Sequence, residues 1–341
     1  GQMLAEALSD KNIHPSVLAT VSKFHRNSGQ LPPELAEIFR PSTASSALTA
    51  ELLAEDLDAL TIDVERFGDA ARGELIYRRK NVACVNCHAI GPAGSTIGPN
   101  LVAVGAAAKT RYLVESILKP NAAIAEHYEN KLFLLEDGSL QTGIVTFQSE
   151  REVIVRDAGQ GGKEIRLDAD EILDERPQPS AMPAALADQL NSREEFLDLA
   201  KFISVLGKPG AYANDESPVI RKWRVIATTP GGDLPRDDAD WMPAYSKVGG
   251  ELPLEDLAIG DLVAVRGFVN VLVAGTARLE INATEGLALW IDGAPVDDLS
   301  APIKLGQGRR TFTFTLHPSQ RDQGLRVEMK AADDAIKVQP E

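Results

Sequence analysis

The sequence predicts a multidomain α+β protein, in which a helical core with a small inserted β-barrel precedes an all-β sandwich. Its 341 residues are more than one compact unit needs. A composition of 44% hydrophobic and 25% charged residues is that of a globular chain with material for more than one core. The third observation is a change of pattern along the chain, from helical periodicity to short β-branched runs. We expect a helical N-terminal segment at 1–62, a helical core at 63–213 and a sandwich at 214–341.

The net charge limits the partners of the chain. Thirty-five Lys and Arg residues stand against 50 Asp and Glu residues, which gives a net charge of −15. This balance disfavours nucleic acid, which needs a cationic face, and anionic lipid for the same reason. No stretch approaches the roughly 18 unbroken apolar residues of a membrane span. We therefore expect neither a nucleic-acid partner nor a membrane span.

Helical periodicity marks the first two regions. Amphipathic runs predict helices in the N-terminal segment at 15–24, 32–39 and 48–60, and in the core at 67–80, 110–118 and 192–206. Asp69 favours the start of its helix through the helix dipole. Ser192 and Glu195 have the spacing of a capping box, and Gly207 stops the same helix.

A run of β-type segments interrupts the core at about residues 128–175. Alternating or β-branched stretches occur at 131–135, 140–147, 152–156 and 164–168. The Asp137-Gly138 dipeptide between the first two is a strong hairpin signal. We expect a small SH3-like barrel without reactive groups of its own, which shields a site or presents a docking surface.

The chemistry of the core rests on the only two cysteines, Cys84 and Cys87, and on His88, which follows at once. C-x-x-C-H is the pattern of covalent haem c attachment. Two thiols at this spacing add to the two vinyl groups of the porphyrin, and the adjacent imidazole binds the iron. A zinc site, a thioredoxin-like redox pair and a local disulfide remain alternatives. A zinc site would need about four ligands, and the chain has no second pair of cysteines. A thioredoxin-like redox pair would need its strand and helix setting. A disulfide between cysteines at this spacing is strained.

The order of several motifs resembles the Planctomycete–Verrucomicrobium-type haem-binding domain, which is similar to class I cytochrome c. The motifs in question are GDAARGELIYRRKNVACVNCHAIG, IGPNL, YLVESILKPNAAI, SAMP and LAKFISVLGKPG. The resemblance implies a class I cytochrome c helical core whose first and last helices cross at a small residue, with Gly73 and Phe202 as candidates. It also implies that His88 donates a hydrogen bond to the carbonyl of Pro99.

The second axial ligand of the haem iron is expected to be Met182. The resemblance implies a Met at this position, in the proline-rich loop just before the closing helix. A thioether favours ferrous iron and raises the reduction potential, which suits electron transfer. His127 is the rival ligand, and a methionine that only fills a gap in the core is the plainer alternative.

The sequence therefore predicts an electron-transfer protein with one covalent haem c and its iron, which relays electrons between a dehydrogenase and a redox partner protein. An enzymatic role is left open and is less favoured. A haem enzyme or gas sensor with a displaceable Met182 is one alternative, and a carbohydrate-binding module that carries a redox domain is the other. Three roles are open for Arg78, Arg79 and Lys80: they steer the partner, lie near the haem propionates or form a solvated helix face. Covalent haem attachment implies the periplasm or an extracellular face.

Short strands separated by Gly, Asp and Pro predict a sandwich in the last region. They are expected at 223–226, 262–266, 268–274, 277–283, 287–291, 311–316 and 325–329. The stretches ARLEINATEGLALWIDGAPV and LGQGRRTFTFTL are similar to PA14-like and galactose-binding-like domains, and this implies carbohydrate as a partner. Trp223, Trp241 and Trp290 are the aromatic candidates. We expect Trp290 in the core and Trp241 to be the most exposed.

Overall fold

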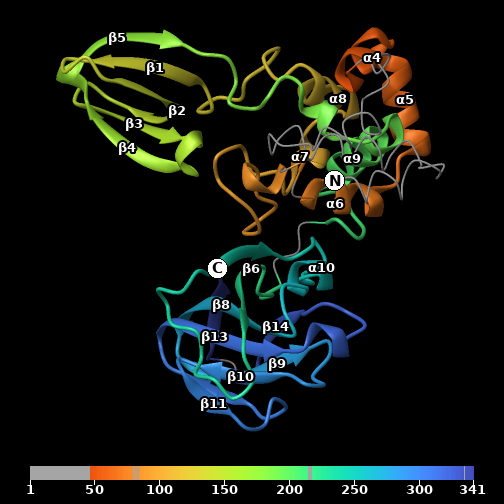
Figure 1. Ribbon diagram of the computed structural model, residues 1–341, viewed down its shortest axis with the longest axis vertical. Helices are drawn as coiled ribbons and strands as arrows, with labels where there is room; N and C mark the ends of the chain where they lie inside the picture. Colours follow the sequence, from red (N-terminus) through yellow and green to blue (C-terminus); the bar gives the residue numbers. More distant parts are fainter. Residues whose placement is uncertain (1–46, 80, 83, 214–216, 334) are drawn as a thin grey trace, which may run out of the picture. The chain divides into compact units, whose positions relative to one another are not determined.

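The computed structural model describes residues 47–79, 81–82, 84–213, 217–333 and 335–341 (Figure 1). Its contacts divide the chain into two units. Unit 1 holds the described residues from 47 to Cys84, with Ile97–Pro99 and Val104–Val205. Unit 2 holds Val85–Thr96, Asn100–Ala103 and Leu206–Glu341. The helices expected at 15–24 and 32–39 lie outside the described residues.

The helices expected among the described residues of unit 1 form close to where the sequence predicts them, and one short helix, Val104–Ala107, was not predicted. Their bounds are α4 Leu48–Ala54, α5 Leu57–Phe67, α6 Ala70–Arg78, α7 Val104–Ala107, α8 Thr110–Leu118 and α9 Arg193–Val205. The run expected as one helix at 48–60 is broken into α4 and α5, because the side chain of Asp56 accepts hydrogen bonds from the amides of Asp58 and Ala59 and so caps a new helix. Asp69 caps α6 in the same way.

Helices α6 and α9 cross at Gly73, as expected for Gly73 and Phe202. A Cβ atom at Gly73 would lie 2.0 Å from the carbonyl oxygen of Asp198 and 2.6 Å from the Cβ of Phe202. Asp198 is only 4% exposed. Its carboxylate accepts hydrogen bonds from the amide of Asp69 at 2.7 Å and from Arg72 Nε at 2.7 Å and Nη2 at 2.9 Å. The crossing therefore combines a close backbone approach with a buried charged brace at the start of α6.

We expect Gly73→Ala to lower the free energy of unfolding by about 3 kcal/mol, because the added methyl group meets backbone and cannot be accommodated by a rotamer change. The measurement is the midpoint of urea unfolding. Gly249→Ala is the matched control, since no atom lies within 4 Å of a Cβ at that position. A Gly73→Ala chain as stable as the control would show that the helices do not approach this closely.

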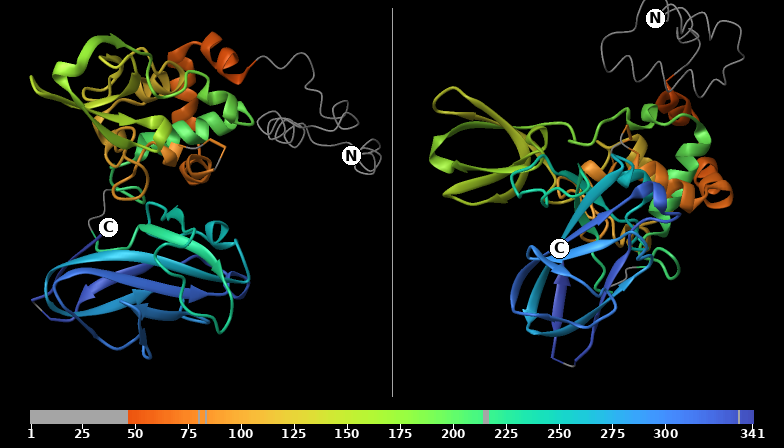
Figure 2. Two further views of the ribbon diagram at one scale, coloured as in Figure 1. Left: turned by 60° about the vertical axis from the view of Figure 1, so that its left-hand side comes forward. Right: turned by 60° about the horizontal axis from the view of Figure 1, so that its bottom comes forward.

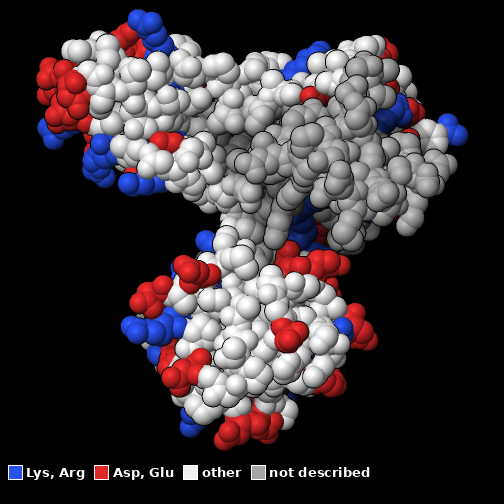
Figure 3. Space-filling model, viewed as in Figure 1, with Lys and Arg blue, Asp and Glu red and all other residues white. Residues whose placement is uncertain are grey.

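The inserted segment of unit 1 is a five-stranded antiparallel sheet in the order β4-β3-β2-β1-β5 (Figure 1). The strands are β1 Asn130–Leu135, β2 Leu140–Gln148, β3 Glu152–Asp157, β4 Lys163–Asp168 and β5 Ile172–Pro177. Phe133, Val153, Val155 and Leu167 form its own core. Acidic side chains gather at the end of the sheet that holds the β1–β2 turn (Figure 3). The strands were predicted well, but their pairings leave β4 and β5 at the two ends of an open path and do not close a barrel.

Unit 2 contains two antiparallel sheets that pack as the layers of a sandwich (Figures 1 and 2). The larger sheet has the order β11-β10-β13-β8-β6-β7, with β15 also paired to β8, and the smaller one has the order β12-β9-β14. Their bounds are β6 Lys222–Thr228, β7 Met242–Tyr245, β8 Leu262–Val273, β9 Gly275–Ile281, β10 Ala288–Ile291, β11 Ala294–Val296, β12 Ile303–Leu305, β13 Gly308–Leu316, β14 Val327–Ala331 and β15 Lys337–Pro340. A short helix, α10 Leu254–Leu257, lies between β7 and β8 in the chain. Side chains from both sheets share one core.

The predicted fold class was wrong in one respect: a class I cytochrome c helical core is not evident. The described chain is mostly β, with three antiparallel sheets and about 25% helix. Among the described residues, no group of three or more His, Cys, Asp or Glu side chains is placed to hold a metal ion. The fold class differs from the prediction because the helices are short, whereas the strands are longer and more numerous than expected. Residues 262–273, for example, form one strand, β8, where two were predicted.

Candidate functional site

The two cysteines lie at the start and just beyond the end of one short turn. Residues Cys84–Asn86 form a 3-10 helix, and Cys87 follows it directly. Side chains three positions apart are eclipsed in this helix type, and Cys87 is three positions after Cys84, so we expect the two thiols to leave the backbone on the same side. Both cysteines and His88 are half-buried, and no disulfide joins the thiols. Burial raises the pKa of the Cys87 thiol, which keeps it protonated at neutral pH, unlike the reactive thiolate of a redox pair.

A compact loop follows His88 and is fixed by backbone hydrogen bonds. Ile90 and Ala93 exchange two of them, from Ile90 N at 2.8 Å and from Ala93 N at 3.2 Å. The amide of Leu101 donates to the carbonyl of Ala89 at 2.8 Å. The loop therefore returns to the residue next to His88 and holds the backbone on both sides of the motif.

Asn100 closes this loop with its side chain. Its Oδ1 accepts from the amides of Gly91 and Val102, each at 3.0 Å, and its Nδ2 donates to the carbonyl of Gly91 at 2.6 Å. The sequence analysis did not single out Asn100. The signal was present in the Gly-Pro-Asn turn, because Asn side chains readily bond to nearby backbone in such turns.

Gly94 allows the loop to pass close to His88. Its φ is +128°, and a Cβ there would lie 2.5 Å from the carbonyl oxygen of His88. A larger residue is therefore excluded on both conformational and steric grounds. The turn, the closed loop and this close approach together give the C-x-x-C-H segment one fixed backbone path.

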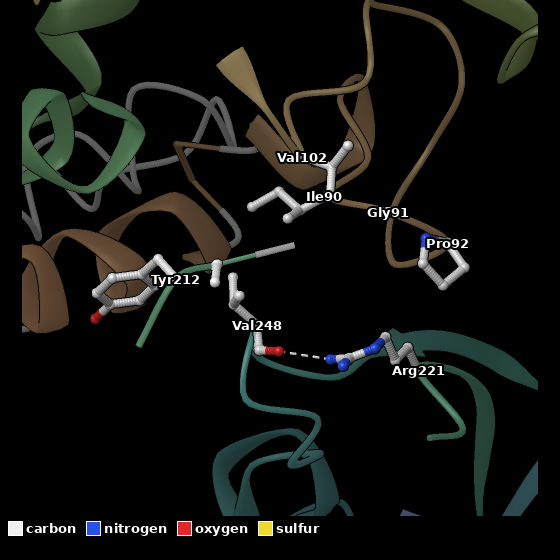
Figure 4. A pocket seen from close by; sticks show the side chains of 8 residues that line it. Ile90, Gly91, Pro92, Val102, Tyr212, Arg221 and Val248 are labelled. Carbon is white, nitrogen blue, oxygen red and sulfur yellow. Dashed lines mark hydrogen bonds between the residues drawn. The ribbon is translucent and has the colours of Figure 1, made fainter. Parts of the chain in front are cut away.

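A small pocket within unit 2 lies beside this loop (Figure 4). It is lined by Ile90, Gly91, Pro92, Val102, Tyr212, Ala213, Arg221 and Val248. Arg221 is only 7% exposed and donates to the carbonyl of Val248 at 2.5 Å. Residues that follow the C-x-x-C-H motif therefore line the same pocket as residues at the start of the C-terminal sandwich.

Met182 lies in the loop between β5 and the 3-10 helix Leu186–Gln189 and is half-buried. The loop is fixed by two asparagines outside it. Asn121 Oδ1 accepts from the amide of Ser180 at 2.7 Å, and Asn130 Nδ2 donates to the carbonyl of Pro179 at 3.0 Å. The hydroxyl of Ser180 in turn accepts from the amide of Met182 at 3.2 Å. The backbone of the proposed ligand is therefore held, and neither asparagine was identified from sequence.

The remaining predicted site residues have different outcomes. Pro99 is half-buried and belongs to unit 1, whereas His88 belongs to unit 2, and the hydrogen bond between them remains a prediction. His127, the rival ligand, has a side chain that is 75% exposed. Arg79 forms a bidentate ion pair with Glu195 at 2.7 and 2.8 Å, so it is used inside unit 1. Lys80 lies outside the described residues.

The three tryptophans of unit 2 differ from expectation. Trp223 is 1% exposed, and its Nε1 donates to the hydroxyl of Ser246, so it is a core residue. The prediction that Trp290 lies in the core was wrong: its neighbour Leu289 faces the core, and Trp290 is half-buried on the opposite face of the strand. Trp241 is half-buried, with the guanidinium of Arg266 4.3 Å from its ring centre.

The chain matches no protein-family model, and comparison with curated proteins gives no match. None of the described helices has the length and apolar character needed to cross a membrane.

Proposed function

We propose that the chain is an electron-transfer protein that carries one covalent haem c. The observation that carries this proposal is the placement of Cys84 and Cys87 around a single 3-10 turn, with His88 next in the chain. Two cysteines three positions apart around such a turn suit two thioether bonds to one porphyrin edge. The resemblance to the Planctomycete–Verrucomicrobium-type haem-binding domain, drawn from the motifs above, supports the same function.

When bound, haem c supplies one-electron redox chemistry at its iron. The residues of the chain have separate tasks in this proposal. Cys84 and Cys87 would hold the porphyrin through their sulfur atoms, and the imidazole of His88 and the thioether of Met182 would bind its iron. The closed loop after His88 fixes the backbone from which the imidazole projects. A fixed ligand set keeps the geometry similar in both oxidation states, which favours rapid electron exchange with a redox partner protein.

A gas-sensing or enzymatic role is the second candidate, favoured by one observation. Met182 is only half-buried, in the loop between β5 and the 3-10 helix Leu186–Gln189. A ligand in such a loop is more easily displaced than one in a packed core. Covalent haem attachment takes place outside the cytoplasm, so either role implies the periplasm or an extracellular face.

The test uses the full chain, expressed in a host that attaches haem covalently. We expect a reversible one-electron wave in voltammetry and a ferrous visible spectrum that carbon monoxide leaves unchanged, because both axial positions are filled. A spectrum shifted by carbon monoxide would favour the sensor. A colourless chain with the mass of the bare polypeptide would overturn both candidates.

A further inference from the structure

Two loops of unit 1 meet close to Met182. The first loop, residues 119–129, lies between α8 and β1, and the second, residues 178–185, lies between β5 and the 3-10 helix Leu186–Gln189. They are tied together where Asn121 Oδ1 accepts from the amide of Ser180 at 2.7 Å. Helix α8 and the 3-10 helix, which flank the two loops, also contact each other. The two loops therefore belong to one surface beside Met182.

This surface is exposed and carries no charged side chain. All residues at 121–125 are exposed, with Ile124 at 37%, and so are residues 183–185 in the second loop. The sequence has no Asp, Glu, Lys or Arg at 120–125 or at 177–187, although these residue types make up 25% of the chain. A contiguous exposed surface of apolar side chains marks a binding site.

Backbone turns hold Ile124 in a defined position. The amide of Ala122 donates to the carbonyl of Lys119 at 2.9 Å, and the amide of Tyr128 donates to the carbonyl of Ala125 at 3.0 Å. One turn thus fixes the backbone on each side of Ile124. The residues directly before and after Ile124 are alanines, so it supplies the largest apolar side chain between the two turns.

We propose that Ile124 contacts the porphyrin ring of the haem c whose iron Met182 would bind. This contact rests on the proposed function and extends it to the lining of the haem site. Three observations favour a porphyrin as the occupant. The surface adjoins the loop of the proposed thioether ligand. Its alanines let a flat and rigid ring come within van der Waals distance of the backbone. Its lack of charge matches an apolar ring, because covering a charge with such a ring would cost desolvation energy.

The direct test is a nuclear magnetic resonance spectrum of the full chain, haem-loaded and reduced, with isotope-labelled isoleucine methyl groups. The ring current of a porphyrin moves the signals of methyl protons that lie over its face far upfield. We expect this shift for the Ile124 methyl group, whose signal is identified by its loss in Ile124→Val. The methyl signal of Ile62, which is 60% exposed on α5, should keep its ordinary position. An Ile124 signal in the ordinary range would overturn the proposed contact.

A second measurement is the midpoint potential of Ile124→Glu. We expect it to fall, because a carboxylate beside the ring stabilises ferric iron, which carries the additional positive charge. Leu140→Glu is the matched control, since Leu140 is 64% exposed on β2 and the substitution adds the same charge. Equal shifts in the two variants would contradict the contact, because the potential would then follow net charge alone.

A second copy of the chain is the rival occupant of this surface. A dimer in light scattering that dissociates in Ile124→Glu and persists in Leu140→Glu would assign the surface to self-association and overturn the haem contact. Haem staining of a denaturing gel is recorded for every sample. A stained chain with an unshifted Ile124 signal rejects the contact alone, whereas an unstained chain rejects the proposed function and the contact with it.

Discussion

A chain carrying Cys84→Ala and Cys87→Ala together should lose covalent haem completely. Both thioether bonds disappear, and axial coordination by His88 alone does not survive denaturation. Haem-dependent peroxidase staining of a denaturing gel should show a stained band for the native chain and none for the double variant. Intact mass should fall by the mass of the haem beyond the change caused by the substitutions. Each single variant should retain one thioether, and therefore a stained band of reduced yield.

His127→Ala is the control for this experiment, because His127 is exposed and its loss should leave staining and spectrum unchanged. Far-ultraviolet circular dichroism of the double variant should keep the β-rich signal of the three sheets, which lie outside the motif. A double variant that still stains, or a native chain whose two thiols alkylate fully after purification from a haem-attaching host, would rule out the proposed attachment.

Elements that depend on local signals were predicted closely. Helix α8 was predicted at 110–118 and forms at Thr110–Leu118, because Pro120 forbids its continuation. Helix α9 was predicted at 192–206 and forms at Arg193–Val205. The hydroxyl of Ser192 accepts from the amide of Glu195 as in the expected capping box, whereas the carboxylate of Glu195 accepts from the amide of Asn191, and Gly207 ends the helix with a φ of +77°. Caps and stops act within one helical turn, so the sequence alone carries their information.

Features that depend on distant partners were not predicted. Strand β8 replaces two expected strands, and Gly267 lies where they were expected to separate. A Cβ at Gly267 would lie 2.6 Å from Ile220 and 3.0 Å from the ring of Trp223. The pattern predicts a break between strands at Gly267, but this glycine makes room for the ring of Trp223 in the core. The asparagines that fix the loops around the candidate site, Asn100, Asn121 and Asn130, likewise act through partners that periodicity does not reveal.

In the candidate site, too, the local features were predicted from the sequence and the surrounding fold was not. The C-x-x-C-H spacing predicts chemistry and a local turn, and the turn is present at Cys84–Asn86. The motif carries no information about the fold around it, because thioether chemistry constrains only the few residues that contact the porphyrin edge. The class I cytochrome c core was inferred from that chemistry and from resemblance, and the mostly β chain overturned it. Ligand chemistry and fold should therefore be argued from separate observations.

Met182→Ala should remove the sulfur-to-iron charge-transfer band from the red edge of the ferric spectrum and lower the midpoint potential. A thioether stabilises ferrous iron, so its replacement by water or a nitrogen ligand favours the ferric state. The measurement is a redox titration followed by visible absorption. Met242→Ala is the matched control, since Met242 is 44% exposed and belongs to unit 2. An unchanged band in Met182→Ala would assign the second axial ligand to another residue.

Asn121→Ala tests whether the loop that carries Met182 must be held for ligation. This change removes the acceptor for the amide of Ser180 and leaves the sulfur atom in the chain. A freed loop samples positions in which the sulfur is away from the iron, so we expect a weaker charge-transfer band and a larger high-spin fraction, intermediate between the native chain and Met182→Ala. The high-spin fraction should rise further on warming, because loop release gains conformational entropy. A spectrum identical to the native one at all temperatures would show that the asparagine serves only the fold.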